Sequence, residues 1–130
     1  MTKRSESEYR PGYPATAMGL LTPPVLWACY FVLIYSLHGL VCVGKLESTL
    51  ISQQSLPVVV TLLSLATMAV HAGVCIWAWK LWRRLDRCTD PSEMQQRARF
   101  LASVSAANAG LFLVATLWIG LPSLILEPCV

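Results

Sequence analysis

The sequence predicts an all-α integral membrane protein with three transmembrane helices, its N-terminus inside and its C-terminus outside. Of its 130 residues, 55% are hydrophobic and only 13% are charged, about half the charged share of an ordinary soluble domain. The charges are also clustered. Long stretches carry none at all, namely those between Arg10 and Lys45, between Glu47 and Lys80, and between Arg99 and Glu127. A spanning helix needs about 20 mostly apolar residues, so each stretch is long enough for one crossing.

The first span is predicted to follow a polar tail. Residues 1–21 are expected to form this tail, and residues 22–130 to form the membrane domain. Thr22-Pro23-Pro24 resembles a helix start, because proline is tolerated in the first turn, where its missing N–H would have no partner in any case. We therefore expect a first span over about 23–43, ended by Gly44.

The second and third spans have start signals of the same kind. Ser55-Leu56-Pro57 opens a predicted span over about 56–82. Asp90-Pro91-Ser92-Glu93 predicts a capping box, with the aspartate as the cap, the proline first in the helix and the glutamate reaching back. The third helix is thus expected to begin outside the membrane and to span about 99–121.

The orientation follows from the basic residues and the tryptophans. With the N-terminus inside, every lysine and arginine except Lys45 lies on the cytoplasmic side, as the positive-inside rule requires. Trp77, Trp79 and Trp82 lie where a cytoplasmic aromatic belt is expected, and Trp27 lies at the matching end of the first span. Both signals predict the same topology.

The topology places two cysteines, Cys42 and Cys129, on the outer side of the membrane. We expect them to form a disulfide between the first span and the C-terminal tail, since disulfides persist in oxidising compartments. One alternative is a thiol pair that binds copper or exchanges disulfides. The other is that the two are unrelated small apolar residues near helix ends.

The two histidines, His38 and His71, lie within spans, where ionisable residues are costly and often functional. From their positions they differ by about 16 Å in height, which disfavours a bis-histidine haem within one protomer. His71 lies at the depth of Asn108, so we expect an interhelical polar contact between these two. His38 could contribute, with Cys42 and Cys129, to a copper site at the outer surface.

The sequence carries no strong catalytic motif. It contains no Ser-His-Asp set, no glycine-rich phosphate loop and no His-Glu-x-x-His, so we expect no enzymatic activity and no required cofactor. None of the predicted spans contains a carboxylate, which disfavours a proton-coupled carrier. The basic residues flank the spans, so we expect a lipid bilayer and other membrane subunits as partners, and no nucleic acid.

Three segments taken together resemble a known family. They are Pro23-Pro24-Val25-Leu26-Trp27-Ala28-Cys29-Tyr30-Phe31 with Tyr35, His38-Gly39-Leu40-Val41-Cys42, and Leu117-Trp118-Ile119-Gly120-Leu121-Pro122 running to Glu127-Pro128-Cys129. They resemble small, largely uncharacterised bacterial inner-membrane proteins that are encoded beside cytochrome c oxidase and its assembly factors. The resemblance implies a multi-pass protein of the bacterial inner membrane, associated with terminal oxidase biogenesis or structure. The chain departs from the family in Tyr30, where many relatives have a histidine, and in its Glu-Pro-Cys tail.

Three functions remain open at this point. The leading expectation is a non-enzymatic accessory subunit or assembly partner of a respiratory haem–copper oxidase. The second is a copper or haem handling protein that uses His38, Cys42 and Cys129 at the outer surface. The third is a small oligomeric channel or transporter in which polar side chains line a pore across protomers, namely Ser36, His71 and Asn108.

Overall fold

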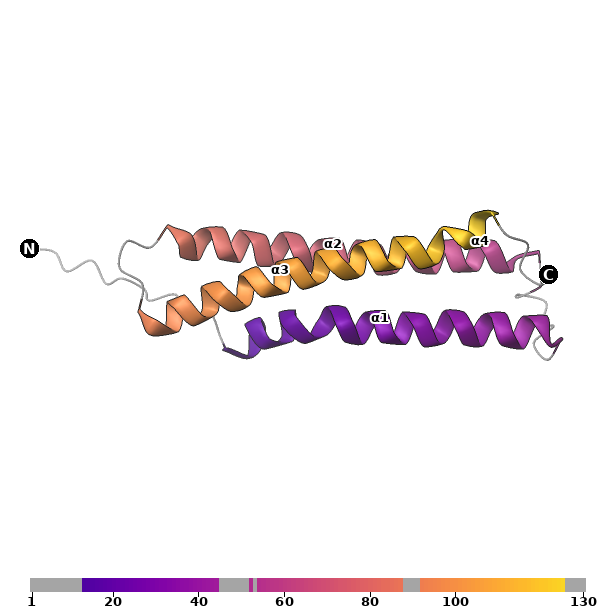
Figure 1. Cartoon of the computed structure of the whole chain (residues 1–130), viewed down its shortest axis with the longest axis horizontal. Coiled ribbons are helices and arrows are strands. Elements are labelled where there is room, and N and C mark those ends of the chain that lie inside the picture. Colours follow the sequence, from indigo (N-terminus) through magenta and orange to yellow (C-terminus); the bar gives the residue numbers. More distant parts are fainter. Residues whose placement is uncertain (1–12, 45–51, 53, 88–91, 126–130) are drawn as a thin grey trace, which may run out of the picture.

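The described part of the protein is entirely helical. The structure, a computed structural model, describes residues 13–44, 52, 54–87 and 92–125. In chain order the elements are α1 (Tyr13–Cys42), α2 (Leu56–Asp86), α3 (Glu93–Gly120) and the short α4 (Pro122–Ile125). The three long helices lie side by side along the longest axis of the molecule, and α1 and α3 run opposite to α2 (Figure 1). This confirms the predicted all-α class.

All three long helices are long and apolar enough to cross a membrane. The stretches that qualify are Thr16–Cys42, Leu56–Asp86 and Glu93–Gly120. The chain is therefore a multi-pass membrane protein. Many large apolar side chains point outward, among them Trp118 at 79% exposed and Phe100 at 68%, as expected for surfaces that face lipid rather than water.

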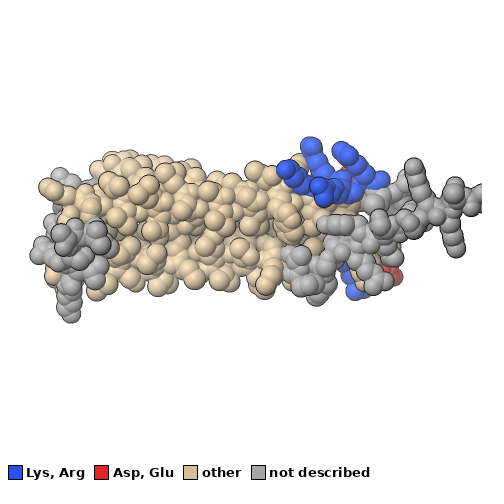
Figure 2. Space-filling view, turned by 180° about the vertical axis from the view of Figure 1, so that it is seen from behind, with Lys and Arg blue, Asp and Glu red and all other residues tan. Residues whose placement is uncertain are grey.

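The two ends of the bundle differ in charge. At one end, where α2 finishes and α3 begins, lysines and arginines gather on the surface, while the middle of the molecule carries none on the face shown (Figure 2). We call this the basic end; it comprises Lys80, Arg83, Arg84, Arg87, Arg97 and Arg99. At the other end α1 finishes, α2 begins and α4 lies (Figure 1). We call this the Cys42 end.

The first helix starts earlier than the sequence predicted. It begins at Tyr13 rather than at Pro23, so that Pro23 and Pro24 lie inside it, and part of the expected polar tail is helical. Interior proline normally breaks a helix because it removes an N–H bond, which neighbouring helices can replace in a membrane protein. The added turns also pack closely, because a Cβ on Gly19 would lie 2.7 Å from the Trp77 ring.

The other helix ends also shift by a few residues. The helix α2 continues past the predicted end to Asp86. The cap of α3 is Ser92 instead of Asp90, which lies outside the described residues. Ser92 N donates to Gln95 Oε1 at 3.1 Å, and Gln95 N donates to Ser92 Oγ at 3.4 Å. Ser-x-x-Gln is itself a capping-box pattern, and it places the cap two residues later than predicted.

Apolar packing falls into two clusters. One lies at the Cys42 end and joins α1 to α2; its buried members are Tyr30, Ile34, Val41, Leu56 and Val60. The other lies at the basic end and joins α2 to α3; its buried members are Leu81, Leu85, Ala98 and Ala102. Along α2, buried polar side chains, namely Ser64, Thr67 and His71, occupy the level between the two clusters. These polar side chains are candidates for a functional role.

Candidate functional site

A polar layer crosses the middle of the bundle at the prolines of α1. Pro24 has no N–H, so the carbonyl of Leu20 lacks the partner that it would have in an uninterrupted helix. Asn108 of α3 supplies a replacement, because its Nδ2 donates to the Leu20 oxygen at 3.1 Å. A side chain of α3 therefore satisfies a backbone group that the proline leaves open.

His71 of α2 bonds to the same turn of α1. Its ring is completely buried, and Nε2 lies 3.2 Å from the carbonyl oxygen of Pro23. Because a carbonyl only accepts, Nε2 carries the proton of this bond. The other ring nitrogen, Nδ1, has no hydrogen-bond partner, and the ring stacks on Phe112 with centroids 6.2 Å apart. The histidine thus donates one hydrogen bond from α2 to the backbone of α1 beside the proline pair.

These bonds correct the predicted contact between His71 and Asn108. Both side chains make interhelical hydrogen bonds, but each bonds to the backbone of α1 and not to the other. For Asn108 the physical reason is that Pro24 leaves the Leu20 carbonyl without its helical donor. The sequence signal was available, since a proline pair inside an apolar run implies unpaired carbonyls four residues earlier.

Trp27 also lies elsewhere than predicted. Instead of marking the membrane interface, it packs inside the bundle, 5.4 Å from Phe31 and 5.5 Å from Phe112 between ring centroids. Because α1 starts at Tyr13, this residue is in mid-helix. Its indole N–H is buried without a hydrogen-bond partner, as is the hydroxyl of Ser105. The side chains described in this layer offer hydrogen-bond donors and acceptors, and no carboxylate is among them.

A second polar contact joins all three long helices nearer the Cys42 end. Ser64 donates to the carbonyl of Val60 at 2.7 Å, so the Tyr30 hydroxyl is the donor in the 2.7 Å bond between Tyr30 and Ser64. Gly120 of α3 packs directly against this pair, since a Cβ there would lie 2.9 Å from Ser64 Oγ. Tyr30 stands where the resemblance places a histidine, and here its hydroxyl is used in helix packing.

The outer cysteines were predicted to form a disulfide or to hold copper. Cys42 is disulfide-bonded, whereas Cys129 lies outside the described residues. Cys29 and Cys75 are free thiols. A disulfide sulfur carries no thiolate charge, so in this state Cys42 lacks the soft ligand character that a copper site uses.

The histidines are placed apart. His38 directs Nδ1 to the Ile34 carbonyl of its own helix at 3.1 Å. Since His71 lies at the level of Pro23, the two histidines are about 22 Å apart along α1 at 1.5 Å per residue, which is too far for one haem iron within a protomer. Within the described ranges, no three His, Cys, Asp or Glu side chains gather as a metal site would require.

The three side chains predicted to line a pore do not share a face. Ser36 is exposed on α1, His71 is completely buried in α2, and Asn108 is half-buried and bonded to α1. A pore across protomers would need all three on the outward surface, and only Ser36 is there.

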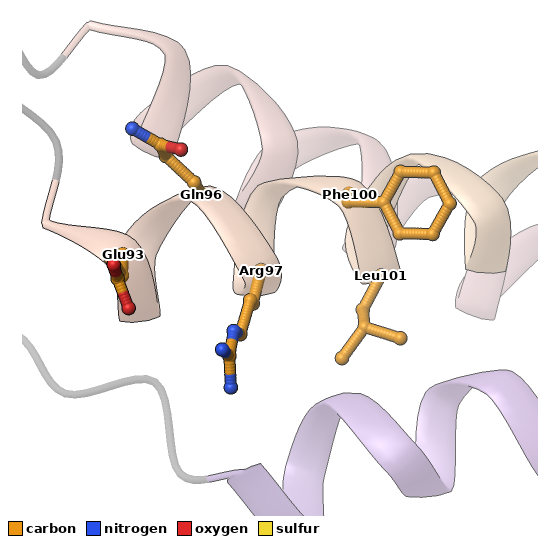
Figure 3. A pocket seen from close by; sticks show the side chains of 5 residues that line it. All are labelled: Glu93, Gln96, Arg97, Phe100 and Leu101. Carbon is orange, nitrogen blue, oxygen red and sulfur yellow. The ribbon is translucent and has the colours of Figure 1, made fainter.

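An open pocket of about 600 Å³ lies at the basic end of α3. Its lining residues are Glu93, Gln96, Arg97, Phe100 and Leu101. Arg97 and Leu101 point toward α1, whereas Gln96 and Phe100 point away from it (Figure 3). Among these five described residues, the pocket combines one guanidinium and one carboxylate with the apolar side chains of Phe100 and Leu101.

Comparison with known proteins adds no assignment. No family model, no curated protein and no solved structure matches this chain.

Proposed function

We propose that this protein is a non-catalytic membrane subunit or assembly partner that packs against a larger membrane complex. The observation that carries the proposal is a row of small and medium side chains along the outward face of α1. The row, called the α1 stripe, comprises Val25, Cys29, Val32, Ser36, Gly39 and Val43, all exposed. The intervals alternate between four and three residues, which is the repeat along which two helices stay in contact.

The composition of the α1 stripe favours a helix as its neighbour. Small side chains let two helix backbones approach closely inside a membrane, where packing drives association. At Gly39 no atom lies within 4 Å of a would-be Cβ, so this part of α1 is open. The outward face of α3 near the Cys42 end is different, because it presents the bulky side chains of Leu111 and Trp118.

The partner that we propose is a respiratory haem–copper oxidase of a bacterial inner membrane. This choice rests on the resemblance of the segments around Trp27, His38 and Trp118 to proteins encoded beside cytochrome c oxidase. The proposed orientation, with the N-terminus inside, rests on the positive-inside rule. It would place the basic end in the cytoplasm and the Cys42 end outside.

We further infer that Cys129 is the disulfide partner of Cys42. With Cys29 and Cys75 free, the remaining cysteines are Cys88 and Cys129. Val41 packs with Leu56 at the start of α2, and Arg87 follows the far end of that helix, about 46 Å away. Cys88 is the next residue and cannot bridge that distance. Four residues after Ile125, by contrast, reach up to about 14 Å, and α4 lies at the Cys42 end (Figure 1).

The test is a pull-down of the full-length tagged protein from its native membrane in mild detergent, with identification of the partners. Wild-type protein is expected to retain oxidase subunits, whereas Gly39→Leu is expected to lose them because the added side chain separates the helices. Gly73→Leu is the matched control, since Gly73 is also exposed with nothing within 4 Å of a Cβ. Wild-type protein without oxidase subunits would refute the partner. Equal recovery with Gly39→Leu would refute the α1 stripe as the docking face.

A further inference from the structure

A narrow groove runs between α2 and α3 near the basic end, separate from the pocket at Arg97. We call it the α2–α3 groove; its volume is about 300 Å³ and its lining residues are Cys75, Trp79, Trp82, Ser103, Ala106 and Ala107. On the α3 side the groove is lined by small side chains, and on the α2 side by the indole rings of Trp79 and Trp82. The groove lies within the stretches that are apolar enough to span a membrane, so an apolar occupant suits it.

Two arginines stand over the aromatic walls of this groove. The guanidinium of Arg83 lies 5.5 Å from the centroid of the Trp79 ring, and that of Arg99 lies 6.0 Å from the centroid of Trp82. Cations are attracted to the faces of indole rings at such distances. The rings therefore hold two positive charges where the groove meets the basic end.

Among the described residues, most of the positive charge at this end has no ion-pair partner. Within residues 13–44, 52, 54–87 and 92–125 the sole ion pair joins Arg99 to Asp86. Lys80, Arg83 and Arg84 are exposed on the last turns of α2. Asp86 reduces the pull of Arg99 on an anion, so Arg83 is the principal attracting group at the mouth of the groove.

We propose that the α2–α3 groove binds one anionic phospholipid, with its phosphate at Arg83 and Arg99 and one acyl chain along Ser103 and Ala107. Basic clusters directly beside a spanning helix attract anionic lipids, and here an apolar groove continues from the cations into the membrane. A zwitterionic lipid carries its own cation beside the phosphate, so it gains less from Arg83. This site does not depend on the proposed oxidase partner.

The headgroup is tested with the full-length protein in mild detergent, given equal amounts of phosphatidylglycerol and phosphatidylcholine with the same acyl chains. Native mass spectrometry counts the bound lipids. Wild-type protein is expected to retain phosphatidylglycerol preferentially. Arg83→Gln is expected to lower the ratio of the two bound lipids about fivefold, the factor that corresponds to about 1 kcal/mol per basic residue near an anionic surface. Arg84→Gln removes the same charge one residue away from the aromatic wall, and it is expected to keep the ratio.

The acyl chain is tested by filling the groove. Ser103→Phe is expected to abolish lipid retention, because the ring occupies the space of the chain. Val114→Phe adds a ring to an exposed position of the same helix that does not line the groove, and it is expected to retain lipid. Circular dichroism and gel filtration confirm that each variant is folded, and all four substituted positions are exposed on the helix surface.

Four results would overturn the proposal. Equal retention of the two lipids by wild-type protein would show no headgroup selection. Equal losses in Arg83→Gln and Arg84→Gln would indicate diffuse charge attraction. Wild-type retention by Ser103→Phe would place the lipid elsewhere. Displacement of the lipid by an equal concentration of glycerol phosphate would show an anion site that makes no use of the groove.

Discussion

Asn108 donates a hydrogen bond to the backbone carbonyl of Leu20 at 3.1 Å, across 88 positions of sequence. This carbonyl is the one that Pro24 leaves without a helical partner. The bond explains how α1 continues through two prolines, and it makes the side chain of α3 part of the backbone hydrogen bonding of α1.

Replacing Asn108 with leucine is expected to lower the free energy of unfolding by about 1–2 kcal/mol. The estimate exceeds the average of about 0.6 kcal/mol for a hydrogen bond between membrane helices, because the Leu20 carbonyl is then left unpaired in an apolar setting. Unfolding of purified protein in mixed micelles, followed by circular dichroism, measures the change.

A double-mutant cycle separates this mechanism from simple packing. Pro24→Ala restores an N–H that can bond to the Leu20 carbonyl, so Asn108→Leu is expected to cost less in that background than in wild-type protein. The same cost in both backgrounds would mean that the asparagine stabilises the bundle in some other way.

Replacing His71 with leucine is expected to have a smaller effect, about 0.5 kcal/mol. The Pro23 carbonyl can still accept the N–H of Trp27 within α1, so no acceptor is stranded, and Nδ1 has no partner to lose. The same unfolding measurement applies. A loss larger than that of Asn108→Leu would contradict this reading and would point to a role for the buried ring beyond its bond to the Pro23 carbonyl.

Gly120→Ala is expected to destabilise the protein by about 1–3 kcal/mol, the usual cost of overpacking. The new methyl would lie 2.9 Å from Ser64 Oγ and 3.2 Å from Ser64 Cβ. Gly110→Ala is the matched control in the same helix, because nothing lies within 4 Å of its Cβ. There the change is expected to be neutral or to stabilise by up to about 1 kcal/mol.

A second substitution, at Ser64, is expected to relieve the clash that Gly120→Ala introduces. Ser64→Gly removes both atoms that the new methyl would meet, so Gly120→Ala is expected to cost less in that background. If Gly120→Ala is as harmless as Gly110→Ala, then the close approach of α2 and α3 at Ser64 is not rigid in the native protein.

The inferred disulfide between Cys42 and Cys129 predicts an intact mass below that of the fully reduced chain, with the two cysteines in one cross-linked peptide after digestion. Closing a loop of about 90 residues is worth at most roughly 4–5 kcal/mol in the chain-entropy model, and less where a bilayer or micelle already restricts the unfolded chain. Cys42→Ser is therefore expected to lower the unfolding midpoint.

Cys29→Ser serves as the control for the disulfide, because Cys29 is a free thiol. It is expected to leave both the mass difference and the midpoint unchanged. A dimer that disappears on reduction would show instead that Cys42 pairs between chains.

The sequence by itself determined the number and rough limits of the spans. Charged groups are costly in hydrocarbon, so their absence from three long stretches is a local property that can be read residue by residue. It also indicated a polar role for His71 and Asn108, since polar side chains inside a membrane need partners. It did not identify those partners, because the choice depends on which helix faces lie together.

Only the tertiary structure decided that Pro23 and Pro24 lie inside α1 and that Trp27 packs within the bundle. Local preference ends a helix at a proline pair, because two N–H groups are missing. In the folded protein, Asn108 of α3 donates to the carbonyl of Leu20, which Pro24 leaves without a helical partner. A helix boundary read from neighbouring residues therefore fails where partners distant in sequence supply the missing hydrogen bonds.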